Sequence, residues 1–344
     1  MEKGNSVNNL RDNIECISMH IQDDCSKEIF SNRLAYSMTE NPIYLEKICS
    51  LSHGYEKFIS FLRDHKKEKK VLFGTGQWGE WIVDTYTSLS WDFCTDNVRN
   101  SSFRGIKYLS VTDLVKSYRD ICFVITIKKQ YMEIYDQLLN MGVSERDIFC
   151  FGQLEKEVEK GIYFDLPYLR AGNNEVFVDA GGYDGESSLA FNSWSSGRGS
   201  IYLFEPSELS LNIAKEKLKN LSNVTYIEKG LYSSSTVMGF SNNGTESKIS
   251  NDGSNQIYVT TLDEYMDEIQ PTFIKMDIEG AEYEALIGAR KTIRKYKPKL
   301  AISIYHKPED IVEIPELILS MNSDYKLWLR HYSMTWFDTV LYAI

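Results

Sequence analysis

Residues 175–185 read Glu175-Val-Phe-Val-Asp179-Ala-Gly181-Gly182-Tyr183-Asp184-Gly185. The pattern predicts an apolar strand that runs into a glycine-rich turn, with a helix from Ser187 to Asn192 after it. Glycines at the end of such a strand let a ligand lie against the backbone, and the start of the helix supplies N–H donors. The stretch therefore predicts a ligand site at the carboxyl edge of an open α/β sheet.

A second strand is predicted at Ser200–Phe204, and it ends in Glu205 and Pro206. Glu205 stands 26 residues after Asp179, where an acidic side chain can accept hydrogen bonds from both hydroxyls of a ribose. Its alternative role is to cap a helix that begins near Ser207. The residues that we expect to bind a nucleoside-containing cofactor are Asp179, Gly181, Gly182, Asp184, Gly185, Glu205 and Pro206.

The composition is that of an ordinary globular protein. The chain has 344 residues, of which 42% are hydrophobic and 25% charged, and its length predicts about two domains. The net charge of −11 disfavours general binding to nucleic acid. No apolar run approaches the roughly 20 residues that span a bilayer, and the N-terminus lacks the apolar core of a secretory signal. We therefore expect a cytoplasmic protein without a membrane span, with its six cysteines reduced.

Three regions follow one another along the sequence: a helical N-terminal segment at 1–65, a small Rossmann-like domain at 66–152 and a larger α/β domain at 153–344. In the larger domain, apolar strands alternate with amphipathic helices, which predicts a parallel sheet. Strands are predicted at 175–179, 200–204, 224–228, 272–277 and 299–305, and helices at 187–193, 207–219, 280–296 and 309–320. Two strands are predicted at 326–331 and 336–343, as a closing antiparallel hairpin. The polar stretch 229–260 predicts either hairpins, with turns at 243–244 and 252–253, or a mobile loop.

Several further motifs lie in this C-terminal half. They are Phe204-Glu205-Pro206, Thr261-Leu262-Asp263, Ile274-Lys-Met-Asp277-Ile-Glu279-Gly-Ala-Glu282, Ser303-Ile-Tyr-His306-Lys-Pro-Glu-Asp310, and Leu329-Arg-His331-Tyr with Thr339-Val-Leu-Tyr. Together with the glycine-rich turn, they make residues 170–344 resemble the FkbM-type family of S-adenosylmethionine-dependent methyltransferases. The block from Ile274 to Glu282 is the most specific of them.

The resemblance implies a class I methyltransferase fold, in which a Rossmann-like sheet of seven strands binds S-adenosyl-L-methionine. It also implies methyl transfer, usually to a hydroxyl oxygen of a sugar or a natural-product scaffold. The expected partner is therefore a small-molecule or glycan acceptor and not a nucleic acid, and a homo-oligomer is possible. The closing antiparallel hairpin fits this kind of sheet better than it fits the sheet of a dehydrogenase.

The candidate catalytic residues are Lys275, Asp277 and His306. Lys275 and Asp277 alternate on one face of a predicted central strand, where a buried lysine belongs either to an internal ion pair or to the site. His306 ends the next strand, and its imidazole can accept the proton that a hydroxyl loses as the methyl group moves, with Asp277 orienting the ring. We expect Glu279 and Glu282 only to favour the first turn of the following helix.

A divalent metal ion is the alternative use of these side chains. Two imidazoles and a carboxylate make a workable ligand set, which Asp277, His306 and His331 would supply. His331 lies in the predicted closing hairpin, however, where an ordinary edge-strand role is at least as well supported. The expectation is therefore that the protein holds no metal.

A second glycine-rich unit comes earlier in the chain. The sequence Gly74-Thr75-Gly76-Gln77-Trp78-Gly79 follows a short apolar strand and precedes a predicted helix at 80–88, with Asp96 about 20 residues further on. The spacing predicts a second nucleotide site at Gly74, Gly76, Gly79 and Asp96, or a module that only forms a dimer. Two alternatives to a methyltransferase follow, a non-catalytic scaffold or sensor that binds a nucleotide or nucleotide-sugar, and an NAD-dependent enzyme. No Tyr-x-x-x-Lys pair in residues 66–152 supports the latter.

Overall fold

The computed structural model describes residues 2–52, 54–241, 248–249, 255–265 and 267–344. It divides into two compact units. The first unit comprises Met1–Ser37, Gly161–Arg330 and Asp338–Ile344, and the second comprises Met38–Lys160 and His331–Phe337. Each unit is thus assembled from stretches that are far apart in the sequence. The domain boundaries that the sequence predicts at 65/66 and 152/153 stay a prediction.

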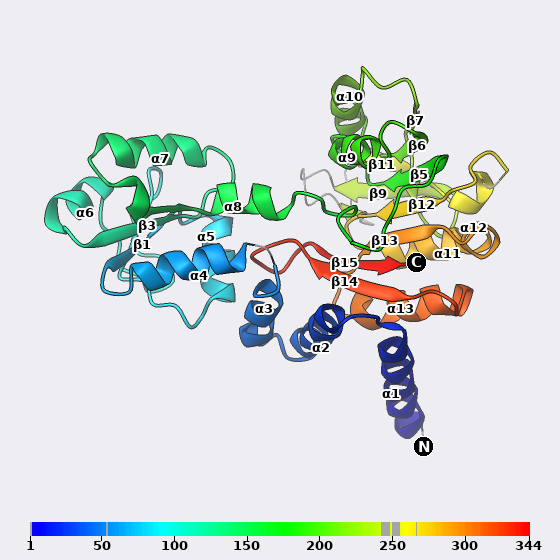
Figure 1. The fold of residues 1–344 in the computed structure, drawn as a ribbon, viewed down its shortest axis with the longest axis horizontal. Helices are drawn as coiled ribbons and strands as arrows, with labels where there is room; N and C mark the ends of the chain where they lie inside the picture. The colour runs from blue at the N-terminus through cyan, green and yellow to red at the C-terminus, as the bar shows by residue number, and fades with distance from the viewer. Residues whose placement is uncertain (1, 53, 242–247, 250–254, 266) are drawn as a thin grey trace. The chain divides into compact units, whose positions relative to one another are not determined.

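The first unit is built on a seven-stranded sheet with the order β14-β15-β13-β12-β5-β6-β7. Figure 1 shows β7 and β14 at its two ends. The strands from β13 to β7 pair in parallel, and β15 runs antiparallel to β13. Their bounds are β5 Glu175–Ala180, β6 Gly199–Phe204, β7 Val224–Ile227, β12 Phe273–Met276, β13 Lys299–Ser303, β14 Leu327–His331 and β15 Thr339–Ala343. The predicted α/β fold with a mixed seven-stranded sheet is confirmed.

Helices α9 to α13 connect these strands, and α1 and α2 precede them. Their bounds are α1 Glu2–His20, α2 Asp24–Thr39, α9 Glu186–Trp194, α10 Glu208–Lys217, α11 Glu282–Gly288, α12 Arg290–Tyr296 and α13 Asp310–Met321. The single helix predicted at 280–296 is wrong, because α11 ends at Gly288, a poor helix former, where a Cβ would overlap the carbonyl oxygen of Tyr232. Within the described residues, no helix is both long and apolar enough to cross a bilayer.

Aromatic side chains fill the core of the first unit beneath β5 and β12. The ring of Phe177 on β5 stacks on Phe191 of α9 with centroids 4.4 Å apart. Phe164, which precedes the sheet in the chain, packs its ring against Phe177 and against Phe273 of β12. All four rings are buried. This packing holds the segment around Phe164 against the centre of the sheet, and it thereby fixes the position of the neighbouring Tyr163.

A smaller sheet with the order β10-β9-β11-β8 lies in the part of the chain that the sequence assigned to hairpins. Its strands are β8 Gly230–Leu231, β9 Thr236–Ser241, β10 Lys248–Ile249 and β11 Asn255–Thr260, and the short 3-10 helix η3 follows at Leu262–Tyr265. The strands β9 and β11 pair antiparallel. The turns predicted at 243–244 and 252–253 lie outside the described residues.

The second unit contains a four-stranded parallel sheet with the order β2-β1-β3-β4. Its strands are β1 Lys69–Phe73, β2 Phe93–Thr95, β3 Ile121–Ile125 and β4 Ile148–Cys150. Its helices are α3 Pro42–Cys49, α4 Tyr55–Asp64, α5 Gln77–Thr85, α6 Val111–Ser117, α7 Tyr131–Asn140 and α8 Phe151–Val158, with the 3-10 helix η1 at Glu145–Asp147. Buried apolar residues of β1 and β3, such as Phe73 and Phe123, pack with Leu114 and Leu138 into its core.

Candidate active site

The glycine-rich turn after β5 lies close to two neighbouring strands. The N–H groups of Gly181 and Gly182 donate to the carbonyl oxygen of Phe204, at 3.0 and 3.2 Å. Gly181 has φ +73°, and a Cβ at this position would overlap the carbonyl oxygen of Asp277. A Cβ at Gly182 would overlap the side chain of Leu203. The glycines are therefore required by packing within the protein, and their predicted contact with a cofactor stays a prediction.

The end of the turn leads into α9 at Gly185, which has φ +83° and stands at the N-cap of that helix. Asp184 beside it forms an ion pair with Lys217, with 2.6 Å between Oδ2 and Nζ. Its Oδ1 accepts a hydrogen bond from the backbone of Glu186 at 3.2 Å. The structure thus places Asp184 at the partly exposed rim of the turn, where it ties α9 to α10.

Asp179 and Lys275 form a buried ion pair behind the turn. Lys275 Nζ lies 3.2 Å from Asp179 Oδ1 and donates to the carbonyl oxygen of Gly181 at 2.7 Å. The hydroxyls of Ser187 and Ser188 donate to Asp179 Oδ2 at 2.7 and 2.6 Å. Of the two alternatives for Lys275, the geometry favours the internal ion pair, which fixes the conformation of the turn.

Glu205 follows β6 and holds the turn from the other side. One carboxylate oxygen accepts from the backbone of Tyr183 at 3.0 Å, and the other accepts from the backbone of Ser207 at 2.8 Å. Burial raises the pKa of Glu205, although both N–H groups act against this rise. Helix α10 has its own cap, because Ser207 Oγ accepts from Ser210 N. Each oxygen of Glu205 keeps a second lone pair, so the carboxylate can still accept from a ligand. Pro206 lies between Glu205 and this cap.

Asp277 follows β12 and is oriented by two tyrosines. The hydroxyl of Tyr163 donates to Oδ2 at 2.8 Å, and that of Tyr305 donates to Oδ1 at 3.2 Å. Burial alone would raise the pKa of Asp277, but the charges of His306 and Lys275 and the Tyr163 hydroxyl keep it below its usual value. The side chain is 24% exposed, so the carboxylate is accessible. Sequence reasoning missed Tyr163, which lies in no motif and 114 residues from its partner.

His306 follows β13 and is surrounded by three carboxylates. Its Nδ1 lies 3.1 Å from Glu282 Oε1, and its Nε2 lies 3.6 Å from both Asp277 Oδ1 and Glu279 Oε2. Burial would lower the pKa of His306, but these carboxylates raise it to about 9. The expectation that Glu282 only favours a helix turn is wrong, because its side chain is fully buried and faces the imidazole.

The structure brings together a different set of possible metal ligands from the one considered for the sequence. Atoms of Asp277, Glu282 and His306 all lie within 4.8 Å of one another. His331 belongs to the second unit, where its Nε2 lies 3.7 Å from Cys49 Sγ. Glu282 thus takes the place that the sequence alternative gave to His331.

The glycine-rich turn of the second unit is tied to Asp96. Thr75 donates to Asp96 Oδ2 from its backbone at 2.7 Å and from its hydroxyl at 2.9 Å, and Val98 N donates to Oδ1 at 2.8 Å. Burial would raise the pKa of Asp96, but these donors keep it below its usual value. Gly74 has φ +118°, and a Cβ at Gly79 would overlap its carbonyl oxygen. The structure brings Gly74, Gly79 and Asp96 together, and their binding of a nucleotide stays a prediction.

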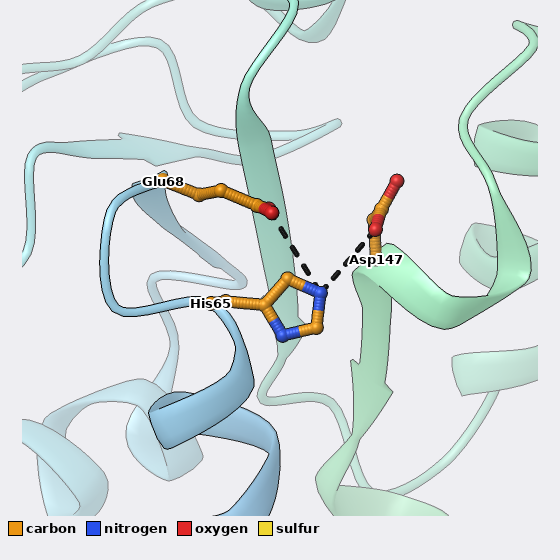
Figure 2. A group of neighbouring side chains, drawn as sticks. All are labelled: His65, Glu68 and Asp147. Atoms are coloured by element: carbon orange, nitrogen blue, oxygen red, sulfur yellow. Dashed lines mark hydrogen bonds and ion pairs between the residues drawn. The ribbon is translucent and has the colours of Figure 1, made fainter.

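The second unit also contains a histidine between two carboxylates, which Figure 2 shows. His65 Nε2 lies 3.3 Å from Asp147 Oδ1 and 3.8 Å from Glu68 Oε2. Its Nδ1 lies 2.7 Å from the carbonyl oxygen of Phe61 within α4. The group joins the end of α4 to η1, and no sequence motif indicated it.

Comparisons with known proteins agree with the fold. Residues 179–327 match the model of the Methyltransferase FkbM domain. The chain is similar to the crystal structure of Methyltransferase FkbM from Methylobacillus flagellatus, with a TM-score of 0.54, 21% identity, and 93% of this chain and 99% of that chain covered. It is also similar to Aeropyrum pernix fibrillarin in complex with S-adenosyl-L-methionine, with a TM-score of 0.37, 12% identity, and 55% and 74% of the two chains covered. No curated protein sequence matches this chain.

The family match covers the turn, Glu205, Asp277 and His306, which all follow strands at one edge of the seven-stranded sheet. The match to the Methylobacillus structure extends over nearly the whole chain and shows the fold. The matched domain is that of an S-adenosylmethionine-dependent methyltransferase, so S-adenosyl-L-methionine is the cofactor. The chain is therefore an S-adenosylmethionine-dependent methyltransferase that carries an FkbM domain at residues 179–327.

Proposed function

We propose that the protein methylates a hydroxyl oxygen of a sugar, a glycan or another natural-product acceptor. The observation that supports this proposal is the close contact between the turn after β5 and the end of β12, where a Cβ on Gly181 would overlap the backbone of Asp277. A cofactor held by the turn would thereby lie beside Asp277 and His306. An acceptor hydroxyl at the same edge would meet both the methyl donor and the groups that can take its proton.

The donor set at this edge fits the cofactor. Glu205 keeps free lone pairs for ribose hydroxyls, and the carboxylates of Asp277 and Glu279 favour a positively charged ligand nearby. When bound, S-adenosylmethionine supplies an electrophilic methyl group on a sulfonium. We propose Asp179, Gly181, Gly182, Asp184, Gly185, Glu205 and Pro206 as its binding residues, with Asp179 and the buried Lys275 acting through the conformation of the turn.

Activation of the hydroxyl falls to His306 and Asp277 in this proposal. An alcohol has a high pKa, so its proton must be taken up as the methyl group arrives. His306 is the proposed proton acceptor in its neutral form, and its raised pKa of about 9 means that this form is reached mainly at alkaline pH. Asp277, held by two tyrosine hydroxyls, positions the ring and the hydroxyl. Lys275 contributes charge to the same carboxylate, which it helps to keep ionised.

The first test is calorimetric titration of the full chain with S-adenosylhomocysteine. We expect binding in the micromolar range that Glu205→Ala weakens roughly tenfold or more, which is about 1.4 kcal/mol. Glu208→Ala is the matched control, because Glu208 is exposed three residues further along and should leave the affinity unchanged. Absence of binding to the wild type would contradict the proposed site.

The acceptor is tested by transfer of a labelled methyl group to a panel of sugars, nucleotide-sugars and polyhydroxylated natural products. We expect an O-methyl ether as the product and its loss in His306→Ala. Transfer only to nitrogen would contradict the O-methylation. Binding of NAD that Asp96→Asn abolishes, without binding of S-adenosylhomocysteine, would instead favour a nucleotide-binding scaffold or an NAD-dependent enzyme.

A further inference from the structure

The side chains around His306 form a built site for a cation. We propose that Asp277, Glu282 and His306 bind a divalent transition-metal ion of the Mn²⁺ or Zn²⁺ type at the carboxyl edge of the seven-stranded sheet. Their ligand atoms come from the ends of β12 and β13 and from the start of α11, and all lie within 4.8 Å of one another. Ligand atoms around an ion with bonds of about 2.1 Å lie about 3.0 to 4.2 Å apart, so only a small closure is needed.

Two residues of this group, His306 and Glu282, carry buried polar atoms that lack a hydrogen bond within the described part of the chain. Only 7% of the His306 side chain and none of the Glu282 side chain is exposed. Three of their atoms have no hydrogen-bond partner of suitable geometry among the described residues. They are both ring nitrogens of His306 and Oε2 of Glu282. Buried polar atoms without such partners are unfavourable, and a coordinated cation would satisfy one ring nitrogen and the carboxylate. This is the observation that separates the group from an ordinary acidic cluster.

Contacts behind these three residues hold the carboxylates in place. Asp277 accepts from the hydroxyls of Tyr163 and Tyr305, and Glu282 Oε1 accepts from the backbone of Ile278 at 2.8 Å. Such outer contacts orient ligands in metal sites. A single cation takes one ring nitrogen of the histidine, and the other nitrogen is left to donate to a carboxylate.

The donor set determines the kind of ion. One imidazole nitrogen with two carboxylate oxygens suits Mn²⁺ or Zn²⁺ better than Ca²⁺ or Mg²⁺, which prefer oxygen ligands only. Three protein ligands leave positions open for water or for an acceptor oxygen. Asp277 is accessible at 24% exposure, so the open positions can be reached from solvent.

What the cation does rests on the proposed function, but its binding does not. A hydroxyl oxygen bound to it would lose its proton to solvent water, because a metal ion lowers the pKa of a bound oxygen. That oxygen forms the new bond to the methyl carbon while the carbon–sulfur bond breaks, and the electron pair of that bond stays on sulfur. With the cation bound, His306 is a ligand, so direct proton uptake by His306 and the cation are alternatives that the experiment separates.

The test is a titration of the full chain, freed of metal by a chelator, with Mn²⁺ followed by calorimetry and by the loss of the free-ion electron paramagnetic resonance signal, and with Zn²⁺ by calorimetry. We expect one ion per chain, with at least tenfold weaker binding in Glu282→Gln and in Asp277→Asn. Glu284→Gln, in the same helical turn, is the matched control and should bind as the wild type does. S-adenosylhomocysteine affinity is measured on every variant to show that the unit is folded.

Each outcome bears on one proposal. Failure of the wild type to bind either ion while it binds S-adenosylhomocysteine would overturn the cation site and leave the proposed function standing. Binding that is unchanged in Glu282→Gln would place the ion elsewhere and would also overturn it. Cation binding that Glu282→Gln weakens, without any affinity for S-adenosylhomocysteine, would support the cation site and contradict the cofactor site as drawn.

Discussion

The two glycine-rich turns of this chain look alike in sequence and differ in chemistry. Each follows a central parallel strand, β5 or β1, and each contains a glycine with a positive φ, Gly181 or Gly74. A Cβ would overlap the backbone of Asp277 at Gly181 and the side chains of Thr126 and Ile127 at Gly74. In each, an acidic residue after the next strand, Glu205 or Asp96, accepts a backbone hydrogen bond from the turn. The shared sequence pattern therefore reflects the conformation of the turn and does not by itself indicate a ligand.

The two turns differ in how many hydrogen-bond acceptor positions of the acidic residue remain unused. Asp96 accepts four hydrogen bonds, two from Thr75 and one each from the backbones of Val98 and Arg99. A carboxylate offers about four lone-pair positions, so Asp96 is fully used within the protein. Within the described residues, Glu205 accepts two hydrogen bonds, so two of its lone-pair positions remain for a ligand.

The neighbouring strand ends differ as well. The end of β12 and the end of β13 place Asp277 and His306 beside the first turn, whereas Thr126 follows β3 and donates to the carbonyl oxygen of Gly74 at 2.8 Å. The edge of the seven-stranded sheet therefore has side chains that can carry charge and protons. The edge of the four-stranded parallel sheet has a hydroxyl that supports its turn. A glycine fingerprint thus becomes a site only through the side chains that other strands bring to it.

The largest expected effect is a loss of stability when an alanine is placed in the turn after β5, with little loss when one is placed in the turn after β1. Gly181→Ala places a Cβ against the carbonyl of Asp277 at φ +73°, so we expect a loss of about 3 kcal/mol or more in the free energy of unfolding and no binding of S-adenosylhomocysteine. Gly76→Ala meets no atom within 4 Å at φ −85° and should change stability by less than about 1 kcal/mol. Urea denaturation of both variants checks this. Equal effects would show that the turns do not differ in packing.

The next effect concerns Glu155, a buried carboxyl of the second unit. Glu155 on α8 accepts from Met334 N at 2.9 Å, and burial raises its pKa from the ordinary 4.5 to about 8. The folded protein therefore binds more protons than the unfolded chain between these pH values, so the free energy of unfolding falls as the pH rises through this window. We expect Glu155 to contribute on the order of 3 kcal/mol to the fall between pH 5 and pH 8, and Glu155→Gln to lose that share, because an amide does not titrate. The raised pKa values of His306, about 9, and of Asp310, about 7, leave a smaller fall of the same sign in the variant.

Denaturation of the wild type, Glu155→Gln and the exposed-residue control Glu133→Gln at both pH values measures this difference. The control should follow the wild type. A pH dependence in Glu155→Gln as steep as that of the wild type would contradict the raised pKa of Glu155.

The smallest effect separates a hydroxyl that serves chemistry from one that serves packing. Tyr163→Phe removes a donor to Asp277, and we expect methyl transfer to slow about tenfold with the affinity for S-adenosylhomocysteine unchanged. Thr126→Val removes a donor to Gly74 and should lower the free energy of unfolding by about 1 kcal/mol without slowing methyl transfer. Equal slowing of methyl transfer in both variants would contradict the different roles of Tyr163 and Thr126.

Much of the first unit follows from local pattern. Apolar runs and turn residues predicted its strands to within a few residues, and the parallel order placed Asp179, Glu205, Asp277 and His306 at one edge. The predicted strand at 336–343 begins only at Thr339, because residues 331–337 belong to the second unit. No local pattern indicates that a short segment between two strands packs with a distant part of the chain.

The sequence by itself determined the α/β fold, the position of the glycine-rich turn and the residues that end each parallel strand, because side-chain periodicity and glycine act over a few neighbouring residues. Only the tertiary structure decided how those residues are used. It paired Lys275 with Asp179, turned Glu282 toward His306, and brought Tyr163 to Asp277 across 114 residues. Charge, burial and lone-pair use depend on such contacts between distant segments, and the chemistry of the site depends on them in turn.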